Sequence, residues 1–418
     1  MTDWPRIPLT WMSRDARIII IARGLLSFGM GTVSVIGAIY LHLLGFSLIQ
    51  IGLFLSAGLA GSILYRFIVV LIGDTLGRRR LLAAFPLMIA GAALAIATMD
   101  NFILMTAVVF LGGFSITGGP GAGGAVRPLE QASLADTVSA DKRTYLYTVY
   151  SIMGRCGAAL GALAAGMPAL YQDSFGLSEL SAMRVAFVTF AVIFALCALL
   201  YSFLSPSVEV SSSGQRWVNP FRLPSRRLIF ILSGLSGMDR FAGGLVVQSL
   251  VSLWFFTRFG VELESLALIF FGSQIIAAIS MWVAARLSNR LGLINTMVFT
   301  HIPSSLIVIA IPFLPNAWIA VSFWLVRSFF GTMDLPLRQS YRMAVVGPQE
   351  RSAMAGVNSV TTAMASTASP PIATALWSIG ATSIPFVACG IIQIAYDLSL
   401  YFMFRKVRPP EEVHRSDD

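Results

Sequence analysis

Twelve apolar segments, each long enough to cross a lipid bilayer as a helix, constrain the fold of this chain more than any other feature. They cover about residues 17–42, 47–72, 81–99, 102–126, 144–169, 183–204, 228–256, 262–285, 294–314, 317–337, 353–379 and 383–404. A spanning helix needs roughly 20 predominantly apolar residues. No segment alternates with the period of two that a barrel strand requires. The sequence therefore predicts an all-α integral membrane protein with twelve transmembrane helices.

Composition supports this prediction and excludes several other classes of protein. The chain is 56% hydrophobic and only 12% charged, whereas soluble domains average about 25% charged residues. The net charge of +9 is spread too thinly to indicate nucleic-acid binding. Cys156, Cys197 and Cys389 lie far apart, without disulfide or metal-ligand spacing. We expect no enzyme activity, no cofactor, no metal and no cleaved signal peptide.

The positions of the basic residues predict which way the chain crosses the membrane. The chain has 27 Arg and 2 Lys, and 20 of these 29 residues fall in the tails and loops on one side of the predicted spans. Only Arg184 and Arg258 fall on the other side. Because Lys and Arg concentrate in cytoplasmic loops, we expect a multi-pass protein of the cytoplasmic membrane with both termini in the cytoplasm.

The chain divides into two halves that match each other in sequence. We expect an N-terminal tail (1–16), a six-helix bundle (17–204), a cytoplasmic linker rich in Ser, Pro and charge (205–227), a second six-helix bundle (228–404) and a cytoplasmic tail (405–418). Gly45 and Gly260 are 215 residues apart, as are the segments 74–77 and 289–292. Residues 128–143 match 336–351 without gaps at an offset of 208.

Because each half has six spans, the two bundles share one orientation. A pseudo-two-fold axis along the membrane normal then relates them, with a binding site between the halves.

The loop Gly73-Asp74-Thr75-Leu76-Gly77-Arg78-Arg79-Arg80 resembles the signature loop of the major facilitator superfamily. Asp74, Gly77 and the three Arg fit that pattern, while Val70 and Thr75 depart from it. A degenerate copy stands at Asn289 to Gly292, and the resemblance covers about residues 17–405. It implies that helices one, four, seven and ten line a central cavity.

For the loop itself, the resemblance implies a gate. Asp74 would bridge to the eleventh helix, and Arg78 to an acid at the end of the fourth, for which Asp136 is the candidate. Gly77 allows a turn with positive φ. The alternative is that the Arg cluster only sets the topology.

The fifth span carries Gly154, Gly157, Gly161 and Gly166, with Pro168. It loosely resembles the antiporter motif of the same family, which would indicate export. The alternative, which we favour, is close helix packing through small residues.

Seven arginines fall within or at the edges of the predicted spans: Arg23, Arg66, Arg127, Arg155, Arg240, Arg327 and Arg338. The acids at similar depth are fewer: Glu130, Asp136, Asp239, Asp334 and Asp397. A charge at the bilayer centre costs roughly 2.5–3.5 kcal/mol even on the lenient insertion scale, so such residues are paired or face a cavity, and are functional by default.

The tenth span is the most informative, because its charged residues are spaced to form one helical face: Arg327, Gly331, Asp334, Arg338 and Arg342. Pro336 is expected to bend this face. Asp334 and Arg338 can pair at i, i+4, which makes Asp334 a poor proton carrier. Arg327 has no obvious local partner and could meet an anionic ligand.

In the seventh span, Asp239 and Arg240 point about 100° apart. Asp239 could carry a proton, or Arg240 could neutralise it through a third group, and the sequence does not separate these alternatives. Gln248 adds a donor further along this span.

In the fourth span, Arg127 and Glu130 lie at i, i+3, and Glu130 corresponds to Arg338 across the duplication. These opposite charges predict either a bridge between the halves or two separate ion pairs. The glycine-rich segment 112–124 predicts a kinked or unwound helix.

In the fifth span, Arg155 is either a substrate ligand or a structural partner of a carboxylate. His301 we interpret as a packing residue.

Together these features predict a monomeric secondary active transporter that moves a small anionic or polyoxygenated solute by alternating access, coupled to H+. Asp239 is the first candidate proton carrier and Glu130 the second. The alternatives are a drug/proton antiporter, a passive facilitator and a non-transporting membrane sensor. A sensor would carry a sizeable soluble domain, and the longest predicted loop has about 23 residues.

Overall fold

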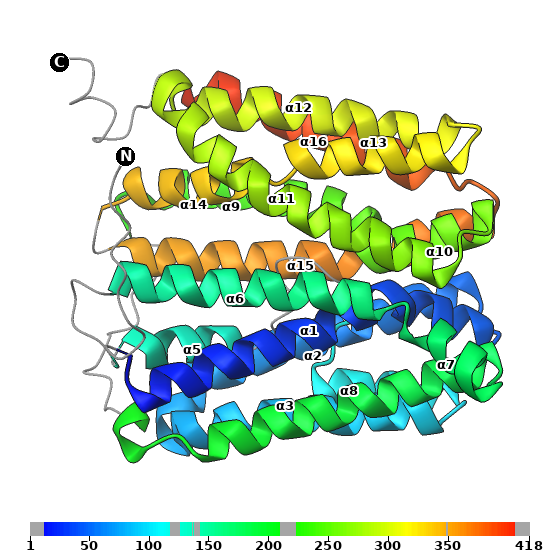
Figure 1. The fold of residues 1–418 in the computed structure, drawn as a ribbon. Coiled ribbons are helices and arrows are strands. Elements are labelled where there is room, and N and C mark those ends of the chain that lie inside the picture. The colour runs from blue at the N-terminus through cyan, green and yellow to red at the C-terminus, as the bar shows by residue number, and fades with distance from the viewer. Residues whose placement is uncertain are drawn as a thin grey trace.

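The computed structural model describes residues 12–117, 126–135, 137, 143–209, 223–347 and 350–405. Within these ranges the chain is all-α and forms two bundles that lie side by side, α1–α8 and α9–α16 (Figure 1). α1 begins and α16 ends at the same end of the molecule, which we call the terminal face. The opposite end, where α1 ends and α16 begins, we call the far face.

The first bundle contains α1 (Arg14–Leu43), α2 (Leu48–Leu76), α3 (Arg78–Thr98), α4 (Phe102–Gly112), α5 (Val126–Ala135), α6 (Arg143–Ala164), α7 (Met167–Phe175) and α8 (Glu179–Ser202). The second contains α9 (Arg226–Leu245), α10 (Gln248–Phe259), α11 (Leu263–Leu291), α12 (Leu293–Ala310), α13 (Ala317–Phe330), α14 (Asp334–Ala344), α15 (Arg351–Ser378) and α16 (Ile384–Phe404). Short 3₁₀ turns occupy Pro206–Glu209 and Ile311–Phe313. These helices make up twelve membrane spans.

Four of the twelve spans are each divided into two helices. The fourth consists of α4 and α5, the fifth of α6 and α7, the seventh of α9 and α10, and the tenth of α13 and α14. The end of α4 at Gly112 agrees with the kinked or unwound helix that the sequence predicts for 112–124, whereas the single helices expected over 144–169, 228–256 and 317–337 are each divided. Gly113, at φ +58°, ends α4 in the left-handed region, which glycine adopts without steric cost.

Among the described residues, eight helical stretches are long and apolar enough to cross a bilayer, counting α9 and α10 as one. α4 and α13 are apolar but short. The fourth and tenth spans continue instead into α5 and α14, which carry charged side chains. α5 and α14, the second parts of these two spans, therefore carry charges that are costly to expose to lipid.

The internal duplication predicted from the sequence is visible in the positions of the helices. α5 and α14 begin at residues 126 and 334, and α6 and α15 begin at 143 and 351, so both pairs are offset by 208. α3 and α12 begin 215 residues apart, and so do α4 and α13. The glycines before α3 and α12, Gly77 and Gly292, have φ of +85° and +81°. The matched sequences therefore adopt matched backbone conformations.

Polar caps define the helix starts at the far face. Ser47, Asn101, Ser178 and Asn316 each accept a hydrogen bond from a backbone N–H in the first turn of the helix that follows. Ser47 also forms a capping box with Gln50. These caps satisfy backbone donors that a helix N-terminus otherwise leaves unpaired.

Within the first bundle, α1 and α6 approach so closely that several contacts leave no room for a side chain. A Cβ on Gly31 would lie 2.4 Å from the Ala158 carbonyl oxygen, and one on Gly157 would lie 2.3 Å from that of Gly24. Thr32 Oγ1 donates to the Gly161 carbonyl at 2.6 Å. The glycines of the fifth span therefore pack helices together, as the small-residue interpretation predicts.

Among the described residues, the two halves contact each other mainly where α1 meets α10, α2 meets α15 and α6 meets α11, with smaller contacts of α11 with α1 and α7. Ser56 donates to the Thr367 carbonyl at 2.6 Å, and Gly52 approaches Pro371 and Thr374. Gly166 lies beside Glu264. All these residues belong to the far-face ends of their helices.

At the terminal face, two carboxylates tie helices within one half. Asp15 accepts hydrogen bonds from the backbone N–H and the hydroxyl of Ser205. Glu350 accepts from the Ser225 N–H at 3.1 Å, and hydrogen bonding to Ser225 lowers the pKa of Glu350 below its usual value. Each bond joins elements of the same bundle, so neither links the halves.

We predict that Gly161→Ala destabilises the protein, because its Cβ would lie 2.0 Å from the Phe28 carbonyl oxygen. Overpacking of this kind costs about 1–3 kcal/mol. Gly234→Ala is the matched control, since nothing lies within 4 Å of a Cβ there. Thermal unfolding of the purified protein in detergent measures both. Equal Tm values for the two variants would contradict the close packing of α1 and α6.

Candidate functional site

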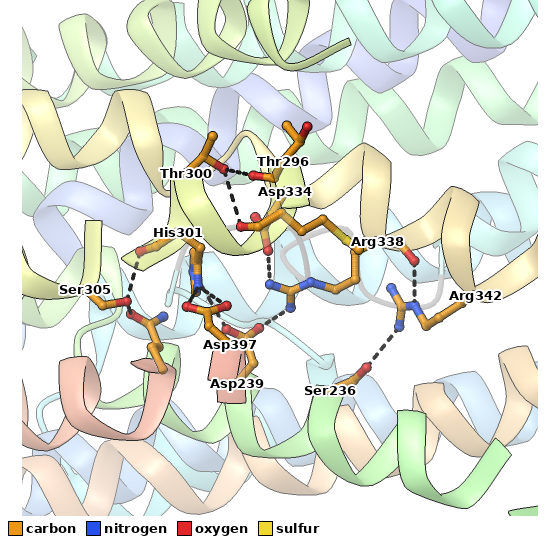
Figure 2. Close-up of polar contacts among 12 residues, drawn as sticks. Ser236, Asp239, Thr296, Thr300, His301, Ser305, Asp334, Arg338, Arg342 and Asp397 are labelled. Carbon is orange, nitrogen blue, oxygen red and sulfur yellow. Dashed lines mark hydrogen bonds and ion pairs between the residues drawn. The ribbon is translucent and has the colours of Figure 1, made fainter. Parts of the chain in front are cut away.

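Arg338 of α14 is the centre of a buried network of charges in the second half. It donates one hydrogen bond to Asp239 of α9 and another to Asp334 of its own helix (Figure 2). Its guanidinium also lies over the Tyr396 ring, 4.9 Å from the centroid. The pairing of Asp334 with Arg338 is the i, i+4 contact that the sequence predicts. The contact with Asp239 joins the seventh span to the tenth.

His301 of α12 extends this network to α16. Its Nδ1 lies 2.9 and 3.1 Å from the two carboxylate oxygens of Asp397. Its Nε2 lies 4.0 Å from Asp239 Oδ1, on the side of Asp239 away from Arg338. Only 3% of His301 is exposed. His301 is buried, as the interpretation as a packing residue predicts. Its carboxylate partners are not predicted, because its sequence neighbours carry no charge and the partners lie 62 and 96 positions away.

The first half holds a second buried network, centred on Glu130 of α5. Tyr150 and Tyr201 donate hydrogen bonds to its two carboxylate oxygens at 2.6 and 2.5 Å. Arg23 Nη1 of α1 lies 3.8 Å from Glu130 Oε2, and its guanidinium lies 5.3 Å from the centroid of the Tyr150 ring. Glu130 is fully buried, so these partners compensate a charge that lipid would exclude.

The two networks are related by the duplication, with the charges reversed. In each half an ion pair joins the first span to the second part of the fourth: Arg23 to Glu130, and Asp239 to Arg338. The sequence left open whether Glu130 and Arg338 bridge the halves or form separate pairs. In this conformation both residues pair within their own half.

Further arginines of both halves surround the space between these networks. Arg127 of α5 interacts electrostatically with Arg23, Arg66 of α2 and Arg155 of α6, and also with Arg240 of α9 in the other half. Arg155 and Arg240 are partly exposed. At a rise of about 1.5 Å per residue, each lies roughly 20 Å along its helix from the terminal face. Like charges therefore meet near the middle of the membrane.

The remaining residues of the tenth span are placed differently from the prediction. Gly331 to Met333 interrupt the helix between α13 and α14, so Arg327 does not share a continuous helical face with the others. Its guanidinium instead lies over Trp324 of α13, 4.8 Å from the ring centroid. The interruption precedes Pro336 because proline in the first turn of a helix lacks the N–H that would bond backward.

On α14 itself, Arg342 donates to the Arg338 carbonyl, to Ser236 Oγ and to Asn358 Oδ1, the last at 2.6 Å. It therefore ties α14 to α9 and α15. Gln248, at the start of α10, donates to Ser34 Oγ of α1 at 3.0 Å. That bond crosses between the halves.

The loop that resembles the family signature is described only in part. Gly77 has the positive φ that the sequence predicts, and Gly292 repeats it in the second half. Arg79 donates to the Ser202 carbonyl of α8. The predicted partner of Arg78, Asp136, lies outside the described residues, and so do the side chains of Asp74 and Asn289. The proposed gate therefore stays a prediction.

Two bundles of six spans, with charged residues converging between them, define the class of multi-pass membrane transporters. A sequence model of the Major Facilitator Superfamily matches residues 19–334. The chain belongs to this superfamily, whose fold is that of transporters and not of enzymes. It is also 21% identical to an uncharacterized membrane protein of Saccharomyces cerevisiae, over 94% of each chain.

Solved transporters share the fold. A bacterial homologue of the human lysosomal transporter Spinster, in an inward-facing and occupied conformation, has a TM-score of 0.74 at 14% identity, covering 94% of this chain and 97% of that one. A D-xylose–proton symporter has a TM-score of 0.73 at 16% identity, covering 94% and 98%. The nucleoside transporter NupG has a TM-score of 0.72 at 14% identity, covering 94% and 100%.

We predict that Glu130→Leu destabilises the protein by about 3–5 kcal/mol, because it leaves the half-buried Arg23 without its ion-pair partner and two tyrosine hydroxyls without acceptors. Glu130→Gln is the matched control, since its amide oxygen can still accept a hydrogen bond. We expect Gln to cost less than half as much as Leu. Thermal unfolding of the two variants measures the difference, and similar losses would contradict the hydrogen-bonded network.

Proposed function

We propose that this protein is a secondary active transporter that moves a small anionic solute across the cytoplasmic membrane by alternating access. The observation that carries the proposal is the excess of arginines over carboxylates within the spans. In the described part of the spans, eight arginines (Arg23, Arg66, Arg127, Arg155, Arg240, Arg327, Arg338 and Arg342) accompany four carboxylates (Glu130, Asp239, Asp334 and Asp397).

Arg155 and Arg240 are the primary candidates to contact the solute. They come from different halves, are partly exposed, and form no ion pair among the described contacts. A guanidinium presents several donors in a planar fork that matches carboxylate and phosphate groups. An anion held between them would contact both halves at once. A polyoxygenated neutral solute could use the same donors, but it would leave the charge uncompensated.

The contacts between the halves support a conformation that opens toward the terminal face. Residues that join the halves, such as Ser34 with Gln248 and Ser56 with Thr367, lie toward the far face. If the termini lie in the cytoplasm, as the distribution of basic residues predicts, this state faces inward. The bundles 17–204 and 228–404 would then rock about the site, joined by the linker 205–227.

Proton coupling is the proposed source of energy, with Asp239 as the first candidate and Glu130 as the second. Both are buried carboxylates that each join the first and fourth spans of a half through an arginine. Adding a proton to either one would weaken its ion pair and allow the two spans to move apart.

The excess of arginines over carboxylates within the spans disfavours the alternative function, export of lipophilic cations.

We predict that organic anions raise the Tm of the purified protein, whereas sugars and lipophilic cations do not, because a ligand stabilises the state that binds it. Arg155→Gln and Arg240→Gln should each weaken the affinity for the stabilising anion by roughly tenfold or more, since a hydrogen bond to a charged group contributes about 1.5–3 kcal/mol. Arg184→Gln is the control, because Arg184 pairs with Asp100 near the far face. Stabilisation by cations alone would contradict an anion site.

We also predict that a pH gradient drives uptake of that anion into proteoliposomes, and that Asp239→Asn abolishes the effect of the gradient. Asn cannot gain or lose a proton, yet it still accepts a hydrogen bond from Arg338. Flux is measured with a radiolabelled anion, with and without a protonophore. Flux that ignores the gradient in the unaltered protein would indicate a passive facilitator instead.

A further inference from the structure

His301 has both ring nitrogens directed at carboxylates from two different helices. Nδ1 lies within hydrogen-bond distance of Asp397, and Nε2 lies 4.0 Å from Asp239 (Figure 2). A neutral imidazole has one N–H donor and one acceptor nitrogen, whereas the imidazolium has two donors. Only the imidazolium can therefore be attracted to both carboxylates at once. In the neutral form one ring nitrogen presents its lone pair to a carboxylate.

Charged and titratable groups lie on each of the helices around His301. α16 contributes Asp397 and Tyr396, α9 contributes Asp239 and Arg240, and α14 contributes Asp334 and Arg338. α13 contributes Arg327, which lies over Trp324. On α11, Arg286 and Arg290 lie near the terminal face, and Arg286 lies over Trp282. Arg338 is bonded to Asp239 and Asp334, whereas Asp397 is bonded to His301. A proton on His301 would therefore place a second positive charge beside Asp239 and Asp397.

We propose that His301, held by Asp397, is the proton-binding site that couples transport to the proton gradient. This inference rests on the proposed proton coupling and assigns it to a particular residue. In this arrangement Asp239 stays ionised as the partner of Arg338, and it responds to the proton instead of carrying it. The exchangeable proton is held between α12, α16 and α9.

The position of Asp239 connects this proton site to the anion site. Loss of the proton from His301 removes the attraction between its Nε2 and Asp239 Oδ1, leaving Asp239 held by Arg338 alone. Arg240 is the next residue of α9 and lies within electrostatic range of Arg66 and Arg127 of the other half. A displacement of α9 at Asp239 therefore also moves Arg240, which the proposed function places against the solute.

The test follows the protonation of His301 and the separation of the halves in the same protein. Spin labels are attached to Arg14→Cys in α1 and Arg405→Cys after α16, both at exposed positions. The exposed Cys156 is replaced by Ser so that it takes no label. The distance between the two labels, measured in nanodiscs, reports the separation of the bundles. The chain has only three histidines, so ¹⁵N-histidine spectra of the protein without spin labels resolve His301, which is assigned by elimination with His42→Gln and His414→Gln. Both measurements run from about pH 5 to pH 8, the range in which histidine changes charge.

We expect the distance distribution to shift with pH, at the same midpoint as the His301 ring nitrogens. His301→Gln should abolish the shift, and Asp397→Asn should displace or abolish it. His42→Gln, which changes an exposed histidine at the far-face end of α1, should leave the shift intact. A shift that persists in His301→Gln, an unaltered protein without any shift, or midpoints that differ would each overturn the proposal.

The flux assay separates this inference from the proposed function. If a pH gradient drives anion uptake equally well in His301→Gln but not in Asp239→Asn, the transporter proposal stands and Asp239 itself carries the proton. If His301 controls the distance between the halves but no anion binds, the proton site stands and the anion proposal fails. The spectra of the unaltered protein decide the protonation of His301 even if His301→Gln does not fold.

Discussion

The energetic cost of charge inside a membrane is the constraint on which the rest of this structure depends. Arg23, Glu130, Asp239 and Arg338 lie well inside the spans, where an uncompensated charge would oppose insertion. Each is held by an opposite charge on another helix, and tyrosines add hydrogen bonds or ring contacts. These contacts fix the second parts of the fourth and tenth spans against the first and seventh. The charged residues therefore organise the bundles as well as preparing a site.

The interrupted spans are consistent with this constraint. α5 and α14 begin at matched positions of the duplication and carry the central charges of their halves. The apolar helices α4 and α13 end early, and the charged helices α5 and α14 follow them after a break. The interruption before α14, at Gly331 to Met333, directly precedes the helix whose Arg338 pairs with Asp239. Backbone that is not helical at membrane depth is tolerated only where protein or a water-filled cavity surrounds it.

Sequence reasoning predicts whatever depends on periodicity and repetition. It finds the twelve spans, the two matched halves, the positive φ of Gly77, and the pair of Asp334 with Arg338, because those signals lie within a few residues or at a constant offset. It misses the interruption that separates Arg327 from Asp334, since glycine alone does not specify a break. It also misses His301, because Asp239 and Asp397 reach it from other helices and no spacing records that contact. The site emerges only when three helices are packed together.

Repulsion between arginines of the two halves affects how an anion could drive closure of the transporter. Arg127 of the first half and Arg240 of the second repel each other across the space between the bundles. In a medium of low effective dielectric such a repulsion is substantial, and it opposes approach of the halves at the terminal face. In the proposed mechanism, an anion bound between Arg155 and Arg240 offsets this repulsion, so closure becomes more favourable when the site is occupied. A neutral solute of the same size has no such effect. On this proposal, the charge excess that selects the solute also makes closure on the terminal side easier when the anion is bound than when the site is empty.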